Sequence, residues 1–365
     1  MSLCLDVPRA AFLSALSLAV GLTSQSQALA ARDSLTDDQR RVLAANQPIA
    51  VEAIVLTDAG TQDPASLRAL VVRRLGELGY QTTDSKSVAQ DGLAVRAKCE
   101  QRKTWEGTTA VGGDNDQPDA PSRLWKGPAC QLTYLLGGQK MKWQKEIRAS
   151  FEDAAEAAKQ SGAADPGAYA MVDLAKQLER YDFPVLLAAQ WGHDDRLLRA
   201  LESSETSQAR KLLIITQLGE MLSDDALPRL KEALKDKDLS RQAAVAIGNI
   251  GREGIPVLVE ILHNSSQPEL QAAAAKGLGQ VGGLHGDATV VPPLLQMLNA
   301  PGIPIEVQTE VAWALGKIPD KRSIEPLYAL DRKLQAIRSE DPKHKKLKEA
   351  VFWSIKQCDT WDQFS

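Results

Sequence analysis

Four related stretches of sequence decide the fold of this chain: KLLIITQLG at Lys211–Gly219, RQAAVAIGNIG at Arg241–Gly251, AAAAKGLGQVG at Ala272–Gly282 and TEVAWALGKI at Thr309–Ile318. Each stretch ends a helical pattern of apolar residues at a shared glycine. These glycines, spaced by 29, 31 and 37 residues, are Gly219, Gly248, Gly279 and Gly316. A period of this length predicts a solenoid, in which each repeat buries its apolar face against the next one.

A second, shorter amphipathic segment lies between successive stretches and carries a proline near its start. The three prolines are Pro228, Pro256 and Pro292. Proline suits the first turn of a helix because the N–H that it lacks would be unpaired there anyway. The chain from residue 195 to residue 358 is therefore expected to form an α-solenoid of about five helix pairs.

This pattern resembles the HEAT-repeat family, in the short form shared with phycobilin lyases, and the resemblance covers roughly residues 196–358. It implies an extended surface suited to proteins or peptides. The family often has an arginine eight residues before the shared glycine. This chain has Lys211, Ser240, Gln271 and Gln308 there, so an arginine ladder is not expected.

Length and charge limit the function classes. A chain of 365 residues exceeds the usual size of one compact core, so two domains are expected. The formal net charge is -4, and neither half of the chain is strongly basic. Nucleic acid is therefore not expected as a partner.

The N-terminus predicts export. Arg9 precedes an apolar run of 13 residues at 10–22, and polar residues 23–27 lead to the small-residue triplet at 28–30. These are the three parts of a secretory signal peptide. We expect residues 1–30 to be removed, which gives a periplasmic or secreted protein without an integral membrane span after cleavage. An uncleaved anchor is the alternative.

Residues 49–182 predict an α+β domain, preceded by a short polar helix within 31–48 in which Thr36 and Gln39 have capping-box spacing. The expected strands are 51–56, 93–100, 129–135 and 141–147, and the expected helices are 64–78, 150–159 and 166–180. This order places one antiparallel sheet against helices. It resembles the small α/β domains of outer-membrane assembly proteins and of periplasmic translocation factors, which implies a role in envelope assembly.

The remaining segments complete the domain prediction. Residues 183–194 contain an apolar run, FPVLLAAQW, which predicts a buried junction helix between the two domains. Residues 359–365 are expected to form a tail.

Three cysteines remain after removal of the signal: Cys99, Cys130 and Cys358. Disulfides persist in oxidising compartments, and Cys99 and Cys130 lie in two strand-like runs, so export predicts that these two are paired. The alternative is two ordinary buried thiols. Cys358 is then a free thiol near the C-terminus.

The long connection at 104–127 is rich in glycine, aspartate and proline, and loops of this length are usually functional or disordered. Opposed residues of an antiparallel hairpin have a constant index sum, which is 229 for Cys99 with Cys130 and 230 for Trp105 with Trp125. One register therefore accommodates both pairs if a bulge shifts it by one residue. The two tryptophans either face a ligand or simply close the loop.

No catalytic constellation is found in the sequence. The four histidines are scattered singly, with no second ligand at metal spacing. We therefore expect no enzyme activity, no cofactor and no metal. The alternatives kept are a lyase-like or accessory maturation protein, and a small-ligand-binding module that uses the loop at 104–127.

Alignment of the second helices on their glycines predicts a partner surface. Positions five, four, two and one before the glycine are apolar or small in most repeats, as in Ala243, Ala244, Ala246 and Ile247. They are expected to face neighbouring helices. The position three before the glycine varies and is expected to be exposed on the groove side: Thr216, Val245, Lys276, Trp313 and, in the fifth pair, Trp353.

Two tryptophans therefore stand on adjacent repeats in this alignment, Trp313 and Trp353. Their neighbours one helical turn away are Thr309 and Glu349, which gives an aromatic patch with a polar rim, the composition of an interface hot spot. The alternative is that both rings fill space inside the longer repeats. The lysines at 343–348 are read as a solvated face or as a docking site for acidic groups. The leading prediction is an exported scaffold or adaptor for a protein partner, whose identity and oligomeric state the sequence leaves open.

Overall fold

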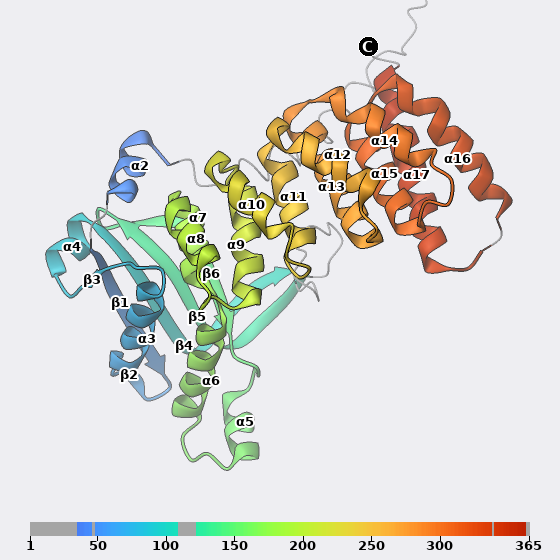
Figure 1. Cartoon of the computed structure of the whole chain (residues 1–365). Helices are drawn as coiled ribbons and strands as arrows, with labels where there is room; N and C mark the ends of the chain where they lie inside the picture. The colour runs from blue at the N-terminus through green and yellow to red at the C-terminus, as the bar shows by residue number, and fades with distance from the viewer. Residues whose placement is uncertain (1–34, 46–47, 109–121, 338, 363–365) are drawn as a thin grey trace, which may run out of the picture. The chain divides into compact units, whose positions relative to one another are not determined.

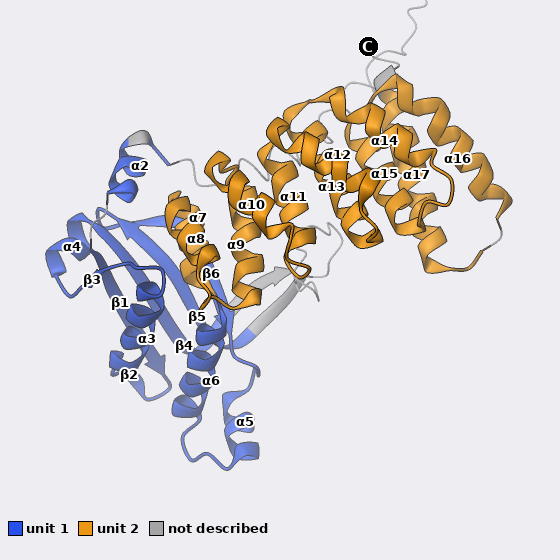
Figure 2. Ribbon diagram, viewed as in Figure 1, with its two compact units in different colours: residues 1–181 blue, residues 182–365 orange. Residues whose placement is uncertain are grey.

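The structure is a computed structural model that describes residues 35–45, 48–108, 122–337 and 339–362 (Figure 1). The chain divides into two compact units, residues 1–181 and 182–365 (Figure 2). The predicted signal peptide at 1–30 lies outside the described residues. Among the described residues, no helix is long and apolar enough to cross a membrane.

The first unit contains six strands and five helices among its described residues. Its strands are β1 (Ile49–Thr57), β2 (Gly60–Gln62), β3 (Thr82–Thr83), β4 (Leu93–Thr108), β5 (Ser122–Leu136) and β6 (Gln139–Arg148). Its helices are α2 (Asp37–Ala44), α3 (Ala65–Gly76), α4 (Lys86–Asp91), α5 (Ala154–Ser161) and α6 (Pro166–Arg180). The expected capping box is present, because Thr36 accepts from the backbone of Gln39 and the Gln39 side chain accepts from Thr36.

The sheet of the first unit is mixed, and the expectation of an antiparallel sheet is wrong. The strand order is β2-β1-β4-β5-β6, with β3 also paired to β1. β1 runs parallel to both β3 and β4, whereas β4, β5 and β6 are antiparallel neighbours. The chain passes through α3 and α4 between β1 and β4, and such a crossover connection brings two strands together in the same direction.

The connection predicted at 104–127 is shorter than expected, because β4 continues to Thr108 and β5 begins at Ser122. Residues 109–121 lie outside the described residues. The core of the first unit lies between the sheet and α6: Val95, Leu132 and Tyr134 of the sheet and Leu174 and Leu178 of α6 are all buried.

The second unit begins with α7 (Phe183–Trp191) and continues as five helix pairs. The pairs are α8 (Asp194–Glu202) with α9 (Gln208–Glu220), α10 (Leu227–Ala233) with α11 (Ser240–Ile250), α12 (Ile255–Asn264) with α13 (Pro268–His285), α14 (Val291–Leu298) with α15 (Ile305–Lys317), and α16 (Ile324–Ala336) with α17 (Pro342–Asp362). The fold class predicted from the sequence, an α+β domain followed by an α-solenoid, is confirmed.

Two local features of the second unit bear on the predicted boundaries. The apolar run within the predicted junction segment 183–194 forms the buried helix α7, which ends at Trp191, falls in the second unit and packs on α8 and α9. The predicted start of the C-terminal tail at residue 359 is wrong, because α17 continues to Asp362. The prolines expected in first turns do occupy the starts of α10, α12 and α14.

The shared glycines allow the second helices to pack backbone against backbone. A Cβ on Gly219 would lie 2.8 Å from Cα of Ala246, and one on Gly279 would lie 2.8 Å from Cβ of Ala314. Gly248 approaches Gly277 more closely still. Because real Cβ atoms do not approach neighbouring atoms this closely, any larger residue would push adjacent repeats apart. The repeated glycine therefore sets the spacing of the solenoid.

Candidate functional site

The second helices of the repeats are α9, α11, α13, α15 and α17, and they present one row of variable residues. We call this the outer row: Thr216, Val245, Lys276, Trp313 and Trp353. Lys276 is exposed and the other four are half-buried, whereas Ala243, Ala244, Ala246 and Ile247 of α11 are buried. The expectation that the whole row is exposed is therefore wrong for four of its five members, although each is more accessible than these buried positions of α11.

The two tryptophans of the outer row contact each other. Their ring centroids are 5.0 Å apart with an interplanar angle of 49°. Gly316 faces Trp353 and Ser354, in the same way that Gly279 faces Ala314 in the preceding repeat. This contact places Trp353 in the alignment without a glycine of its own. Both rings are half-buried, so they pack α17 against α15 and also form part of the surface.

The polar neighbours of the tryptophans differ in what they offer a partner. The Thr309 hydroxyl donates to the carbonyl of Ile305 at 2.7 Å, so its hydrogen is already used within α15. Glu349 is exposed on α17, one turn before Trp353. Of these two predicted rim residues, Glu349 is the one with a charged group free to reach solvent.

A second lysine, which sequence reasoning missed, lies beside the outer row. Lys317 is half-buried on α15, one turn after Trp313, and its stem lies over α13, where it would contact a Cβ on Gly279 or Gly283 at 3.7 and 3.5 Å. Burial, and then repulsion from Lys276, lower the pKa of Lys317, while Glu310 acts in the opposite direction. The available signal was its position one turn after an outer-row residue.

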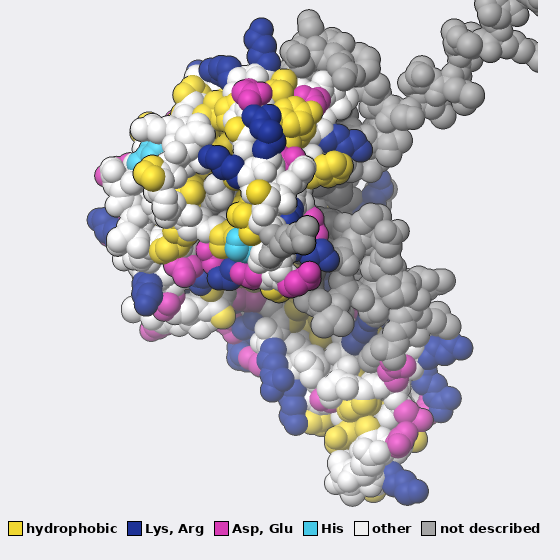
Figure 3. All heavy atoms as spheres, turned by 90° about the vertical axis from the view of Figure 1, so that its right-hand side faces the viewer, with side chains coloured by type: hydrophobic (Ala, Val, Ile, Leu, Met, Phe, Trp, Pro, Cys, Tyr) yellow, Lys and Arg dark blue, Asp and Glu magenta, His cyan; other side chains and the backbone are white. Residues whose placement is uncertain are grey.

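Phe352 is also missing from the sequence prediction. It is 69% exposed on α17, and it occupies the position four before the shared glycine, which is buried in each preceding repeat as Ile215, Ala244, Ala275 and Ala312. In those repeats the following helix pair covers this position. Figure 3 views this end of the second unit and shows hydrophobic side chains interspersed with lysine and arginine.

Polar contacts also link successive repeats at the starts of their first helices. Ser223 donates to Asp194 at 2.8 Å, and Arg252 donates to Asp287 at 2.7 Å. Asp287 is buried. Hydrogen bonds from the hydroxyl and the backbone N–H of Thr289, together with Arg252, hold the pKa of Asp287 at about 2. These contacts lie in the turns that precede the first helices.

The lysines at 343–348 do not act as one group. Lys343 forms an ion pair with Glu306 of α15, and Lys348 donates to the carbonyl of Ile337 at 3.1 Å. Lys345 and Lys346 are exposed. Two of the four lysines therefore have structural roles in the last repeat, and the reading of the whole run as a solvated face is too simple.

The β4–β5 hairpin brings together the cysteines and tryptophans that the sequence paired. Cys99 lies opposite Cys130, and the two form a disulfide with a Cα–Cα distance of 3.9 Å. The register shifts between Glu100 and Lys103, and Trp105 then lies opposite Trp125. The bulge required by the index sums is present. Cys358 is free and buried.

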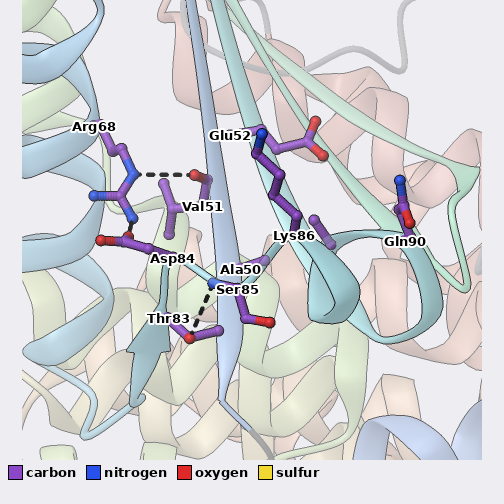
Figure 4. A pocket seen from close by; sticks show the side chains of 10 residues that line it. Ala50, Val51, Glu52, Arg68, Thr83, Asp84, Ser85, Lys86 and Gln90 are labelled. Carbon is purple, nitrogen blue, oxygen red and sulfur yellow. Dashed lines mark hydrogen bonds and ion pairs between the residues drawn. The ribbon is translucent and has the colours of Figure 1, made fainter.

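A cavity in the first unit, of about 500 Å³, lies between β1, α3 and the start of α4 (Figure 4). Arg68 pairs with Asp84 and donates to the carbonyl of Val51 at 3.3 Å. Glu52 forms an ion pair with Arg96 at 2.7 Å. Three of the cavity's charged side chains are thus already paired, and the arrangement does not select a ligand of one charge.

Comparison with known proteins finds a family match within the second unit. Residues 255–341 match a family model described as HEAT repeats. No curated protein matches the chain. A crystal structure of an engineered protein is similar at 21% identity, covering 57% of this chain and 98% of that one with a TM-score of 0.33.

Human deoxyhypusine hydroxylase in complex with glycerol is similar at 18% identity, covering 55% of this chain and 88% of that one with a TM-score of 0.22. Neither likeness carries a functional argument at these scores. Among the described residues, no group of three His, Cys, Asp or Glu side chains is arranged to hold a metal ion. The match to HEAT repeats lies within the C-terminal half of the chain, and such repeats suggest a scaffold for protein interaction.

Proposed function

We propose that the protein is an exported scaffold or adaptor that binds a protein partner along the outer row of its solenoid, in the assembly of the cell envelope. The observation that carries the proposal is the contact of Trp313 with Trp353 across two repeats, at 5.0 Å, with both rings half-buried. Aromatic residues anchored in a packed surface and edged by polar groups are typical of interface hot spots.

The architecture supports this reading. A solenoid presents one residue of each repeat along a continuous line, so a partner gains contacts without a pocket. Lys276 of the outer row lies at one end of the aromatic pair, Glu349 of α17 lies beside the other end, and both are exposed. Export rests on the sequence of residues 1–30, and the absence of enzyme activity stays a prediction.

A capture experiment with matched variants tests the proposal. Lys276→Ala combined with Glu349→Ala removes two exposed side chains beside the aromatic pair. Lys231→Ala combined with Glu232→Ala removes the same two charges from the exposed side of α10. Proteins captured after crosslinking in cells are quantified for each form.

A genuine partner is captured by the wild type and by the α10 variant and is lost with the outer-row variant. Equal capture by all three forms would move the binding surface away from the outer row. Thermal melting of each form ensures that a loss of capture is not a loss of folding.

A further inference from the structure

Two lysines and two tryptophans form a single cluster on the second helices of the third, fourth and fifth repeats. We call Lys276, Trp313, Lys317 and Trp353 the lysine–tryptophan cluster. Lys276 and Trp313 occupy equivalent positions on α13 and α15, and packed helices lie roughly 8 to 10 Å apart. Lys317 lies one turn from Trp313 on the same helix, and the two rings touch.

Neither lysine of the cluster forms an ion pair with a described residue, although Glu310 on α15 attracts Lys317. Among the described residues, no carboxylate lies within ion-pair distance of Lys276 or Lys317. Several other exposed cations of the solenoid do have such a partner, as Arg229 has Glu202 and Lys343 has Glu306. Like charges on neighbouring helices repel each other and are kept at a cost in stability. The ammonium groups of Lys276 and Lys317 are therefore available to a carboxylate of a ligand.

The electrostatics of Lys317 agree with this geometry. Burial lowers its pKa most, repulsion from Lys276 lowers it further, and Glu310 opposes the shift less strongly than Lys276 favours it. A carboxylate placed between the two ammonium groups would relieve the repulsion, and partial burial of Lys317 reduces solvent screening of that contact. The indole rings next to it supply an apolar surface for the neighbouring side chain of the same ligand.

We infer that the lysine–tryptophan cluster binds an acidic peptide segment of the partner, with a carboxylate between Lys276 and Lys317 and an apolar side chain on Trp313 and Trp353. This inference rests on the proposed function and specifies the chemistry of the partner. Glu349, exposed on α17 one turn before Trp353, places a negative charge at that edge of the surface. It directs the acidic end of the segment toward α13 and away from α17.

Fluorescence anisotropy with a labelled peptide tests the inference on the full chain. The probe has one leucine flanked on each side by two glutamates, and the control peptide has glutamines in their place. We expect the acidic probe to bind, to weaken with added salt, and to bind more tightly than the glutamine peptide.

Variants then assign the site. Lys276→Gln is expected to weaken binding about fivefold, the upper range for an exposed ion pair. Lys317→Gln is expected to weaken it more, because its charge is partly desolvated. Lys231→Gln on α10 is the matched control and should leave affinity unchanged. Since Lys276 is exposed, its variant keeps the test valid even if Lys317→Gln folds poorly.

Three outcomes would overturn the inference: no binding of the acidic probe, equal binding of the glutamine peptide, or equal affinity in Lys276→Gln and Lys231→Gln. Binding of phosphatidylglycerol vesicles with the same lysine dependence, without binding of the peptide, would assign the cluster to a membrane surface instead. The peptide assay uses no natural partner, so its failure leaves the capture experiment on the proposed function standing.

Discussion

The indole of Trp353 lies against Gly316, so closely that a Cβ on Gly316 would overlap the ring. The same Cβ would lie 2.5 Å from Oγ of Ser354, which itself donates to the carbonyl of Ala312 at 2.7 Å. This contact seats the last helix on the solenoid and positions the ring that meets Trp313. A glycine that spaces the repeats therefore also shapes the candidate binding surface.

Replacement of this glycine is expected to destabilise the protein. Gly316→Ala inserts a methyl group between α15 and the ring of Trp353, and overpacking of this kind costs about 1 to 3 kcal/mol. Gly283→Ala is the control, because its Cβ would meet nothing nearer than 3.5 Å. That change should be neutral or should stabilise α13 by up to about 1 kcal/mol. Chemical denaturation measures both, and equal stability of the two variants would contradict the packing described for Trp353.

Asp287 should make stability depend on acid. Its folded-state pKa of about 2 lies below the value of about 3.9 expected for an unfolded aspartate. Its contribution is therefore complete above the unfolded value and is lost as the pH falls from about 4 to about 2. Asp287→Asn should remove this part of the pH dependence, and Thr289→Val, which deletes the 2.6 Å hydrogen bond, should reduce it. Denaturation curves that keep the wild-type slope in both variants would refute the assignment.

The disulfide between Cys99 and Cys130 should stabilise the first unit. The two residues are 31 apart in sequence, for which the chain-entropy model gives about 3 to 4 kcal/mol. A reductant should lower the unfolding midpoint of the wild type and have no effect on Cys99→Ala/Cys130→Ala. Mass spectrometry of non-reduced peptides checks the pairing. Finding Cys358 linked to either residue would contradict the structure, in which burial raises the pKa of its thiol.

Lys317 should be less stabilising than an apolar residue of its size. Its charge is partly buried, faces Lys276 and has a lowered pKa, whereas its stem packs over α13. Lys317→Met keeps the stem and removes the charge, so we expect a gain of about 0.5 to 1 kcal/mol together with weaker binding of the acidic probe. Thermal melting checks the first part. A loss of stability would mean that the ammonium group is satisfied in the free protein.

Much of the second unit could be predicted from sequence because its repeats pack in the same way around the shared glycine. The shared glycine fixes which positions face the next helix, and the contact of Gly316 with Trp353 and Ser354 follows the same alignment although the last repeat lacks a glycine. The rule could not predict Phe352, because its exposure follows from the end of the array and not from the pattern within a repeat.

The first unit was harder to predict because the signals were local and the outcome depended on long-range pairing. Alternation identified β4 and β5, and their index sums gave the register of Cys99 with Cys130. Nothing in a single strand indicated that β1 would pair in parallel with β4. Lys317 was missed for a related reason, since the effects on its charge come from burial and from Lys276 on the neighbouring helix.

Site-specific photocrosslinking in cells tests most directly whether the outer row binds a protein partner. A photoreactive residue is placed at Lys276 or Glu349 on second helices, and at exposed Gln296 or Lys333 on the first helices of the fourth and fifth repeats. The account predicts one shared adduct from positions 276 and 349 and none from 296 and 333. An adduct formed from the first helices, with none from the outer row, would contradict it.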